Sequence, residues 1–257
     1  MEEDASISLQ QTAVETSLTE TQVDEALSDV DLLVDEAITI NASLLRSATI
    51  DSSIYVNDCP VITVNTEVKP NVMTIDFGSA CTGKDGKIRS GKIIVTAASF
   101  KLFPSDRQKS FDNYYVDGKK IEGSVSKVIL RDSINHNRTA TIKENVIIIL
   151  PEKKDTAFRV STMTRVYQNN VLKDKTDDQI ISWGTVVNTR PNGVVVTKTI
   201  AETTPLVYKV SCKHIVSGIA SFVNTKGRTW SIDYGDGTCD NVAIFTENGV
   251  TKEITIR

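Results

Sequence analysis

The sequence predicts a mostly β protein: a long antiparallel meander, either a curved sheet or a sandwich, with one N-terminal α-helix packed on it. Three observations predict this class. From about residue 53 onward, short segments rich in β-branched residues partly alternate polar and apolar positions. Two-residue turn signals separate these segments, and one stretch of helical periodicity precedes them. We expect an acidic tail and helix over residues 1–50 and an antiparallel β domain over residues 51–257.

The helix is expected from about Glu20 to Ile40. Acidic residues dominate the first fifty positions, where Arg46 is the single basic residue. Apolar residues recur at spacings of three and four, which places them on one stripe of a helix. These residues are Val23, Ala26, Leu27, Val30, Leu33, Val34 and Ala37. We expect this stripe to dock on the sheet, because isolated helices draw most of their stability from packing. The alternative is a partner-binding or coiled-coil helix.

The strands are expected to form consecutive hairpins. Five turn signals lie between them, at Asp85-Gly86, Asp117-Gly118, Asn192-Gly193, Lys226-Gly227 and Asn248-Gly249. Four of the five are Asx-Gly pairs, which favour a type I′ turn because both residues accept a positive φ. Such a series predicts an antiparallel meander rather than a parallel sheet with crossover helices.

A weak internal repeat links two parts of the chain. Residues 59–81 and residues 212–239 each contain a cysteine, an expected hairpin, the motif [ST]-I-D-[FY]-G and a second cysteine. This pattern indicates either a tandem duplication, over residues 59–130 and 212–257, or the chance recurrence of hairpin sequences. In a true repeat Asp76 and Asp233 hold equivalent positions, where an aspartate before glycine fixes a turn by accepting backbone N–H groups.

The four cysteines, Cys59, Cys81, Cys212 and Cys239, form two similarly placed pairs, which fits an oxidising compartment. Four cysteines allow three pairings. The repeat favours Cys59 with Cys81 and Cys212 with Cys239, and pairing across the two copies is the alternative. Zinc is disfavoured because the chain has no CxxC motif.

The composition argues against several classes of function. A net charge of -4 and a pI near 5.4 do not provide the concentrated basic surface that general nucleic-acid binding requires. The longest apolar run, residues 146–150, suits a buried strand. No common catalytic motif occurs, and only His136 and His214 could act as near-neutral bases. We therefore expect no enzymatic activity and no cofactor.

The segment W-S-I-D-Y-G-D-G-T-C-D-N, residues 230–241, raises the alternative of a metal site. Asp233, Asp236 and Asp240 could supply three oxygens to calcium, but their spacing does not match an EF-hand loop. Glycines on both sides of Asp236 suit a chain reversal that a disulfide at Cys239 would fix. We interpret the segment as a structural turn.

Four aromatic residues are candidates for glycan contact, if they are exposed and coplanar: Tyr114, Tyr115, Trp183 and Trp230. Aromatic residues in strands more often belong to the core. Exposure therefore decides between the two interpretations.

Four motifs, taken together, resemble a group of uncharacterised Bacteroidetes envelope lipoproteins. They are T-I-D-F-G-S-A-C-T-G-K-D-G-K-I-R-S-G-K-I-I-V-T (74–96), F-D-N-Y-Y-V-D-G-K-K-I-E-G (111–123), T-P-L-V-Y-K-V-S-C-K (204–213) and I-D-Y-G-D-G-T-C-D-N (232–241). The resemblance covers most of the chain after about residue 50. It implies export through a lipoprotein signal and tethering by an acylated N-terminal cysteine. Neither stands in this sequence, and we expect that the signal segment has been removed.

The function expected from this resemblance is that of a non-catalytic cell-envelope lipoprotein with a structural or interaction role. We expect it to lie at the outer membrane or cell surface, attached to the membrane only through its lipid anchor, with an unknown protein or glycan as its partner. The alternatives are a glycan-binding surface module and a periplasmic carrier of an apolar ligand bound beneath the helix.

Overall fold

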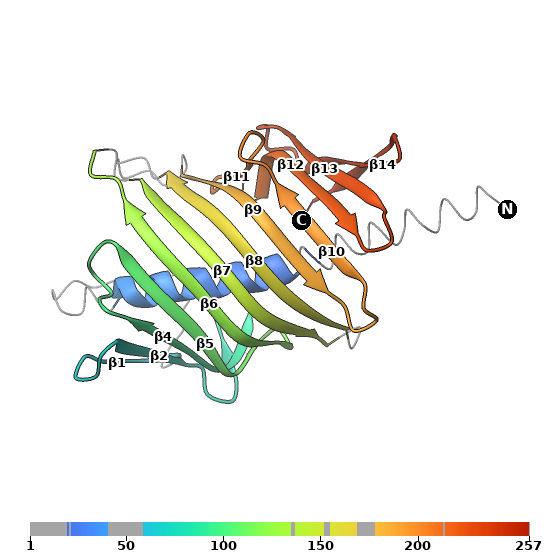
Figure 1. The fold of residues 1–257 in the computed structure, drawn as a ribbon. Coiled ribbons are helices and arrows are strands. Elements are labelled where there is room, and N and C mark those ends of the chain that lie inside the picture. The colour runs from blue at the N-terminus through green and yellow to red at the C-terminus, as the bar shows by residue number, and fades with distance from the viewer. Residues whose placement is uncertain are drawn as a thin grey trace. The chain divides into compact units, whose positions relative to one another are not determined.

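The computed structural model describes residues 20, 22–40, 59–134, 137–151, 155–168, 178–212 and 214–256. Within them the expected fold class is confirmed: one helix, residues 22–40, packs on one antiparallel sheet (Figure 1). The strands are β1 (Val61–Asn65), β2 (Asn71–Asp76), β3 (Cys81–Thr82), β4 (Ile88–Ala97), β5 (Ser105–Val116), β6 (Lys119–Arg131), β7 (Arg138–Leu150), β8 (Asp155–Gln168), β9 (Gln179–Thr189), β10 (Val195–Ile200), β11 (Leu206–Lys209), β12 (His214–Asn224), β13 (Thr229–Asp236), β14 (Val242–Glu247) and β15 (Val250–Thr255).

The sheet is a meander, because strands that are neighbours along the chain are also neighbours in the sheet. The order is β1-β2-β4-β5-β6-β7-β8-β9-β10-β12-β13-β14-β15. The two strands missing from this path are short. β3 pairs with β4 beyond the end of β2, and β11 lies between β9 and β12, as β10 does further along the same strands. The expectation of consecutive hairpins is therefore confirmed.

The turn signals all lie at chain reversals, but the type I′ expectation is wrong at two of the four Asx-Gly pairs. Both residues have a positive φ at Asp117-Gly118 (47° and 75°) and at Asn248-Gly249 (52° and 76°). At Asn192-Gly193 and Asp85-Gly86 only the glycine does. The N–H of Gly193 donates to the carbonyl of Arg190, at 2.9 Å, so this reversal uses one more residue and needs left-handed backbone only at its end.

The chain divides into two compact units, which we describe separately. The helix unit comprises residues 20–128 and 144–159, and so contains the helix, β1 to β5 and parts of β6, β7 and β8. The C-terminal unit comprises residues 129–143 and 160–256 of the described chain. It contains β9 to β15 with the remaining parts of β6, β7 and β8.

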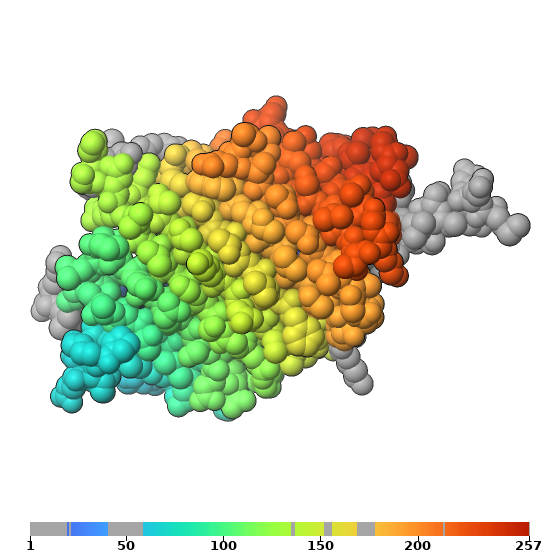
Figure 2. Space-filling model, in the orientation of Figure 1, coloured from blue at the N-terminus to red at the C-terminus, as the bar shows by residue number. Residues whose placement is uncertain are grey.

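The helix contributes its whole apolar stripe to the core of the helix unit. The seven residues of the expected stripe are each no more than 5% exposed. They pack on the inner face of the sheet, where Ile75, Ile93 and Ile121 are fully buried. Figure 1 shows the blue helix lying against these strands, and in Figure 2 the side chains of the strands hide it from view. Each fully buried aliphatic side chain contributes about 1.5–3 kcal/mol before entropy is subtracted.

Glycines with a positive φ lie at a register irregularity in β4 of the helix unit and in β12 of the C-terminal unit. Gly91 in β4 has a φ of 75° and Gly218 in β12 a φ of 103°, and both lie at irregularities of the strand register. A β-carbon would overlap the carbonyl oxygen of Asn113 at the first position and that of Pro205 at the second. Only glycine allows neighbouring backbones to approach this closely.

Candidate functional site

A row of hydroxyl side chains crosses six strands of the C-terminal unit. The register pairs each member with the next, so all six share one face of the sheet. The hydroxyl row consists of Thr185, Thr199, Ser221, Ser231, Thr246 and Thr251, in strands β9, β10, β12, β13, β14 and β15. Neighbouring strands lie about 4.8 Å apart, so the row repeats at that interval over about 24 Å.

A shallow hollow of about 440 Å³ lies over the middle of this row. Thr199, Ser221, Ser231 and Thr246 line it, together with residues of the next row on the same face. Exposed apolar side chains border the row on both sides: Val223 is 43% exposed and Ile244 38% exposed. The surface therefore offers a line of hydrogen-bonding groups with one exposed apolar side chain on either side.

The opposite face of strands β12 to β14 contains buried side chains, among them Phe222, Trp230 and Phe245. Trp230 is also among the residues that line the hollow, but its side chain alternates to the other face and is only 5% exposed. There its ring stacks on Phe222, with the ring centroids 5.3 Å apart and the planes within 3°. Glu247 lies opposite Trp230 in the strand register, and its Oε1 forms an ion pair with Arg228 Nη2 at 2.6 Å. The hydroxyl row therefore lies on the outer face of strands whose inner face is packed.

The aromatic candidates from the sequence do not form an exposed platform. Tyr114 is fully buried, with its ring 5.6 Å from Phe77, and Trp230 belongs to the core described above. Tyr115 and Trp183 are half-buried and lie in different units. Burial removes Tyr114 and Trp230 as stacking surfaces for a sugar, because aromatic rings in strands contribute most by filling the core.

Two disulfides close the chain in the pairing that the repeat favours. Cys59 is bonded to Cys81 and Cys212 to Cys239, with Cα atoms 6.0 and 5.5 Å apart. Disulfides form and persist outside the reducing cytosol. The two bonds therefore indicate an oxidising, extracytoplasmic environment.

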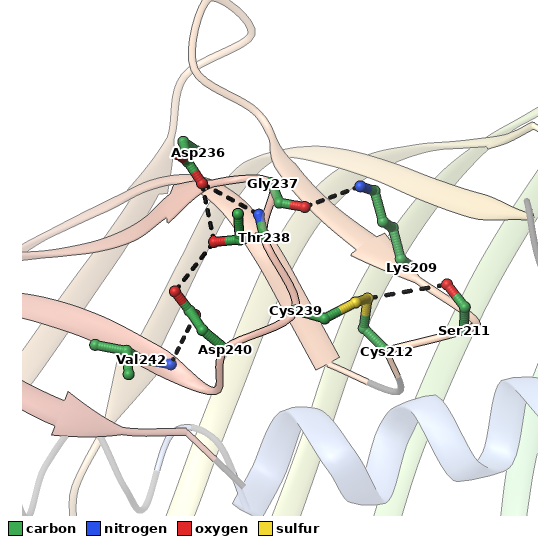
Figure 3. Close-up of a disulfide and its surroundings, with 9 residues drawn as sticks. All are labelled: Lys209, Ser211, Cys212, Asp236, Gly237, Thr238, Cys239, Asp240 and Val242. Carbon is green, nitrogen blue, oxygen red and sulfur yellow. Dashed lines mark hydrogen bonds between the residues drawn. A yellow bond between two sulfur atoms is a disulfide. The ribbon is translucent and has the colours of Figure 1, made fainter.

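Figure 3 shows the second disulfide beside the segment that raised the question of a metal site. The Thr238 hydroxyl lies 3.0 Å from Asp236 Oδ1 and 3.0 Å from Asp240 Oδ2. Asp236 also accepts the Thr238 N–H, and Asp240 accepts the Val242 N–H, both at 3.1 Å. The hydroxyl and N–H of Thr238 lower the pKa of Asp236. These bonds make two consecutive aspartate turns.

Asp233 makes a separate turn of the same kind, because its Oδ1 accepts the Gly235 N–H at 2.9 Å. Lys209 fixes the reversal from the other side by donating to the Gly237 carbonyl at 2.9 Å. In the described part of the chain, no three acidic, histidine or cysteine side chains are grouped to hold a metal ion. The contacts of Asp233, Asp236 and Asp240 are those of a structural turn.

The helix unit contains a network of buried ion pairs that the sequence did not reveal. Arg89 in β4 meets Asp29 of the helix through two bonds, from Nε to Oδ2 at 3.0 Å and from Nη2 to Oδ1 at 2.6 Å. Lys87 adds a bond to Asp29 at 2.9 Å, and Asp85 accepts from Arg89 at 2.6 Å. The side chains of Arg89 and Asp29 are only 1% and 3% exposed.

A second cluster lies further along the helix. Lys109 donates to Asp31, and Lys127 lies 3.6 Å from Asp31 and 3.2 Å from Asp35. Arg107 completes the cluster with a 2.6 Å bond to Asp35. Burial alone would raise the pKa of Asp35, but the charges of Lys127 and Arg107 outweigh it and hold that pKa below its usual value. Burial lowers the pKa of Lys109.

The network ends at Arg159 in β8. Its Nη2 lies 2.7 Å from Asp24 of the helix, and its Nε donates to Glu144 of β7 at 2.7 Å. Charged and apolar side chains therefore both lie at the interface between the helix and the sheet. Of the two histidines, His214 lies at the start of β12 and His136 lies outside the described residues.

Neither the ion-pair network nor the hydroxyl row could be recognised from the sequence alone. The acidic residues of the helix were visible, but nothing local assigned them to buried partners. The serines and threonines were scattered over six segments, and only their register makes them a row.

Comparison with known proteins finds no matching family model, no matching curated protein and no matching solved structure. Among the described residues, no helix combines the length and the apolar character needed to span a membrane.

Proposed function

We propose that this chain is an exported cell-envelope protein with a non-catalytic interaction role, and that its partner is a neutral glycan bound along the hydroxyl row. The two disulfides support export. Attachment to the outer membrane or cell surface through a lipidated cysteine belongs to the same proposal, and it rests on the resemblance to envelope lipoproteins.

The hydroxyl row is the observation that carries the proposal. Four of its members, Thr185, Thr199, Ser221 and Thr251, are exposed, and the other two are half-buried beside the hollow. Each hydroxyl can donate one hydrogen bond and accept two. A regular series of such groups matches a ligand that repeats hydroxyl groups along its own length.

A neutral glycan fits this surface better than a charged polymer does. The row itself contains no charged side chain, and the nearest acids, Asp233 and Glu253, stand in the adjacent row on the same face. They would repel an acidic polymer. Val223 and Ile244 offer apolar contact to the C–H groups of a sugar ring. Hydroxyl contacts alone give a modest affinity, and repetition along the row supplies avidity.

The test is binding of the full chain to immobilised neutral polysaccharides, including glucans, mannans and galactans, at low and high salt. We expect binding that salt does not weaken, because no ion pairs form. The double variant Ser221→Ala/Ser231→Ala should bind roughly 30-fold more weakly, since it loses two hydrogen bonds of about 1 kcal/mol each. Ser124→Ala, an exposed serine in β6 of the other unit, is the matched control and should bind normally.

Equal binding by the wild type and the double variant would show that the row is not the contact surface. Binding only to acidic polysaccharides, with loss at high salt, would contradict the neutral ligand. If the protein binds none of the neutral polysaccharides, the proposal of a neutral glycan ligand is refuted.

A further inference from the structure

The inner face of the helix unit presents five buried cations to the helix. We call Arg89, Arg107, Lys109, Lys127 and Arg159 the cationic face, because they come from four strands, β4, β5, β6 and β8, and point to one side of the sheet. Their side chains are between 1% and 6% exposed. Burial of so many charges is costly unless each one is paired.

The helix forms side-chain ion pairs with all five cations. Asp24, Asp29, Asp31 and Asp35 each form an ion pair with a side chain of a strand, whereas the strands are joined to one another by backbone ladders. The apolar stripe of the helix packs beside them. This is the arrangement by which proteins bind an amphipathic helix from another molecule.

The charges determine which helix the face accepts. A helix without carboxylates in these positions would leave the five cations buried without their helix partners, and each unpaired ion costs several kcal/mol. A purely apolar interface could be equally stable, so the ion pairs add selectivity more than stability. The face is therefore specific for an acidic amphipathic helix.

We propose that the cationic face also binds the helix of a second copy of this chain, so that two copies form a helix-exchanged dimer. Charge complementarity singles out this occupant, because residues 22–40 carry the acids at the spacing that the face requires. An exchanged dimer repeats every contact of the closed monomer, and exchange of an identical element is a low-cost route to dimers.

Charge-reversed partners test the exchange in the full chain. Asp31→Lys reverses the helix and leaves the face intact, whereas Lys109→Asp reverses the face and leaves the helix intact. Alone, each variant should lose about 10 °C in melting temperature, because a buried pair becomes a repulsion. In an equimolar mixture, the helix of the Lys109→Asp chain matches the face of the Asp31→Lys chain. We expect a heterodimer in native mass spectrometry, with most of the lost melting temperature recovered.

The combined variant Asp31→Lys/Lys109→Asp restores the pair within one chain and measures how well the reversed pair fits. Lys120→Glu and Glu122→Lys form the matched control, because they reverse an ion pair of 2.6 Å in β6 that lies at the surface. Mixing these two variants should give neither a heterodimer nor a change in melting temperature.

A mixture that stays as two destabilised species, while the combined variant is stable, would show that the helix docks only within its own chain. Should a single variant fail to fold, the wild type supplies the second measurement. Isotopically heavy and light chains are warmed together at high concentration and cooled. Mixed-mass dimers that Asp31→Asn weakens support the exchange, and their absence refutes it.

Discussion

Arg89 and Asp29 form a two-bond ion pair in the core, 3.0 Å from Nε to Oδ2 and 2.6 Å from Nη2 to Oδ1. Removal of one partner should cost about 3–5 kcal/mol, because the remaining charge stays buried. We expect Arg89→Met and Asp29→Leu each to lower the free energy of unfolding in urea by this amount. The double variant should cost less than the sum. Lys120→Met, which breaks a partly exposed pair, should cost less than about 1 kcal/mol. Additive single effects would show that the two side chains do not interact.

The charges around Asp35 predict loss of stability in acid. Its pKa in the folded protein lies below the ordinary value of 3.8, because the opposing effect of burial is outweighed by the charges of Lys127 and Arg107. A carboxyl whose pKa is lowered by folding stabilises the folded state at any pH above the pKa that it has in the unfolded chain. This contribution disappears as the pH falls below 3.8 toward the pKa of the folded state. The measurement is the free energy of unfolding against pH. Asp35→Asn should be less stable than the wild type at neutral pH, with a difference that shrinks in acid. A constant difference at every pH would contradict this origin.

The register irregularity in β4 predicts unequal effects of two glycine substitutions. At Gly91 the alanine β-carbon would overlap the carbonyl oxygen of Asn113, and φ is 75°. At Gly86, φ is 79° but nothing lies within 4 Å of the new atom. Gly86→Ala should therefore cost only about 1–2 kcal/mol for its left-handed backbone, whereas Gly91→Ala should cost considerably more. Thermal melting compares the two, and equal melting temperatures would show that β4 can move away from β5.

The disulfides predict that denatured, unreduced protein contains almost no free thiol. The bonds span 22 and 27 residues. Each should stabilise the fold by about 3 kcal/mol, because it reduces the conformational entropy of the unfolded chain. Replacement of Cys212 and Cys239 together by alanine should lower the free energy of unfolding by this amount. The protein must be produced under oxidising conditions as a control. Two or more thiols per chain would contradict the prediction.

The turn around Asp236 predicts indifference to calcium. Its carboxylate oxygen Oδ1 accepts hydrogen bonds from the N–H and the hydroxyl of Thr238, so this oxygen is already engaged within the turn. Addition of calcium to chelator-treated protein should leave the melting temperature unchanged, and Asp236→Ala should lower it by removing a turn contact. A rise of several degrees with calcium, abolished by Asp233→Asn and Asp236→Asn together, would reverse this conclusion.

The fold could be predicted from local signals because the fold is local. The described helix reaches Ile40, the last residue expected of it, and Asx-Gly pairs mark hairpins of the sheet. The repeat also has a structural counterpart: Asp76 and Asp233 each accept the N–H of the glycine two residues ahead, both at 2.9 Å. Local sequence carries this information, since the donor lies within the motif.

The charge network could not be predicted in the same way. Strand β5 begins S-D-R-Q-K-S, a wholly polar segment, so alternation does not indicate which face is buried. Arg107 and Lys109 face the core because they form ion pairs there with Asp35 and Asp31 of the helix. These acids lie more than seventy residues earlier in the chain, so no local pattern links them to β5. A charge balance between an acidic helix and a strand with basic alternate positions is the signal that would have suggested this pairing.

The distance between paired residues along the chain also sets an order of folding. Hairpins such as β14–β15 join neighbours, whereas the pair of Lys127 with Asp35 closes a separation of 92 residues. Short loops close early and long ones late, because loop closure costs more entropy as length grows. The helix is therefore synthesised before the strands, but we expect it to dock on the sheet after the hairpins have formed. A chain that crosses a membrane from its N-terminus would therefore carry its acidic segment undocked until β8 has followed, and acidic residues keep such a waiting segment soluble.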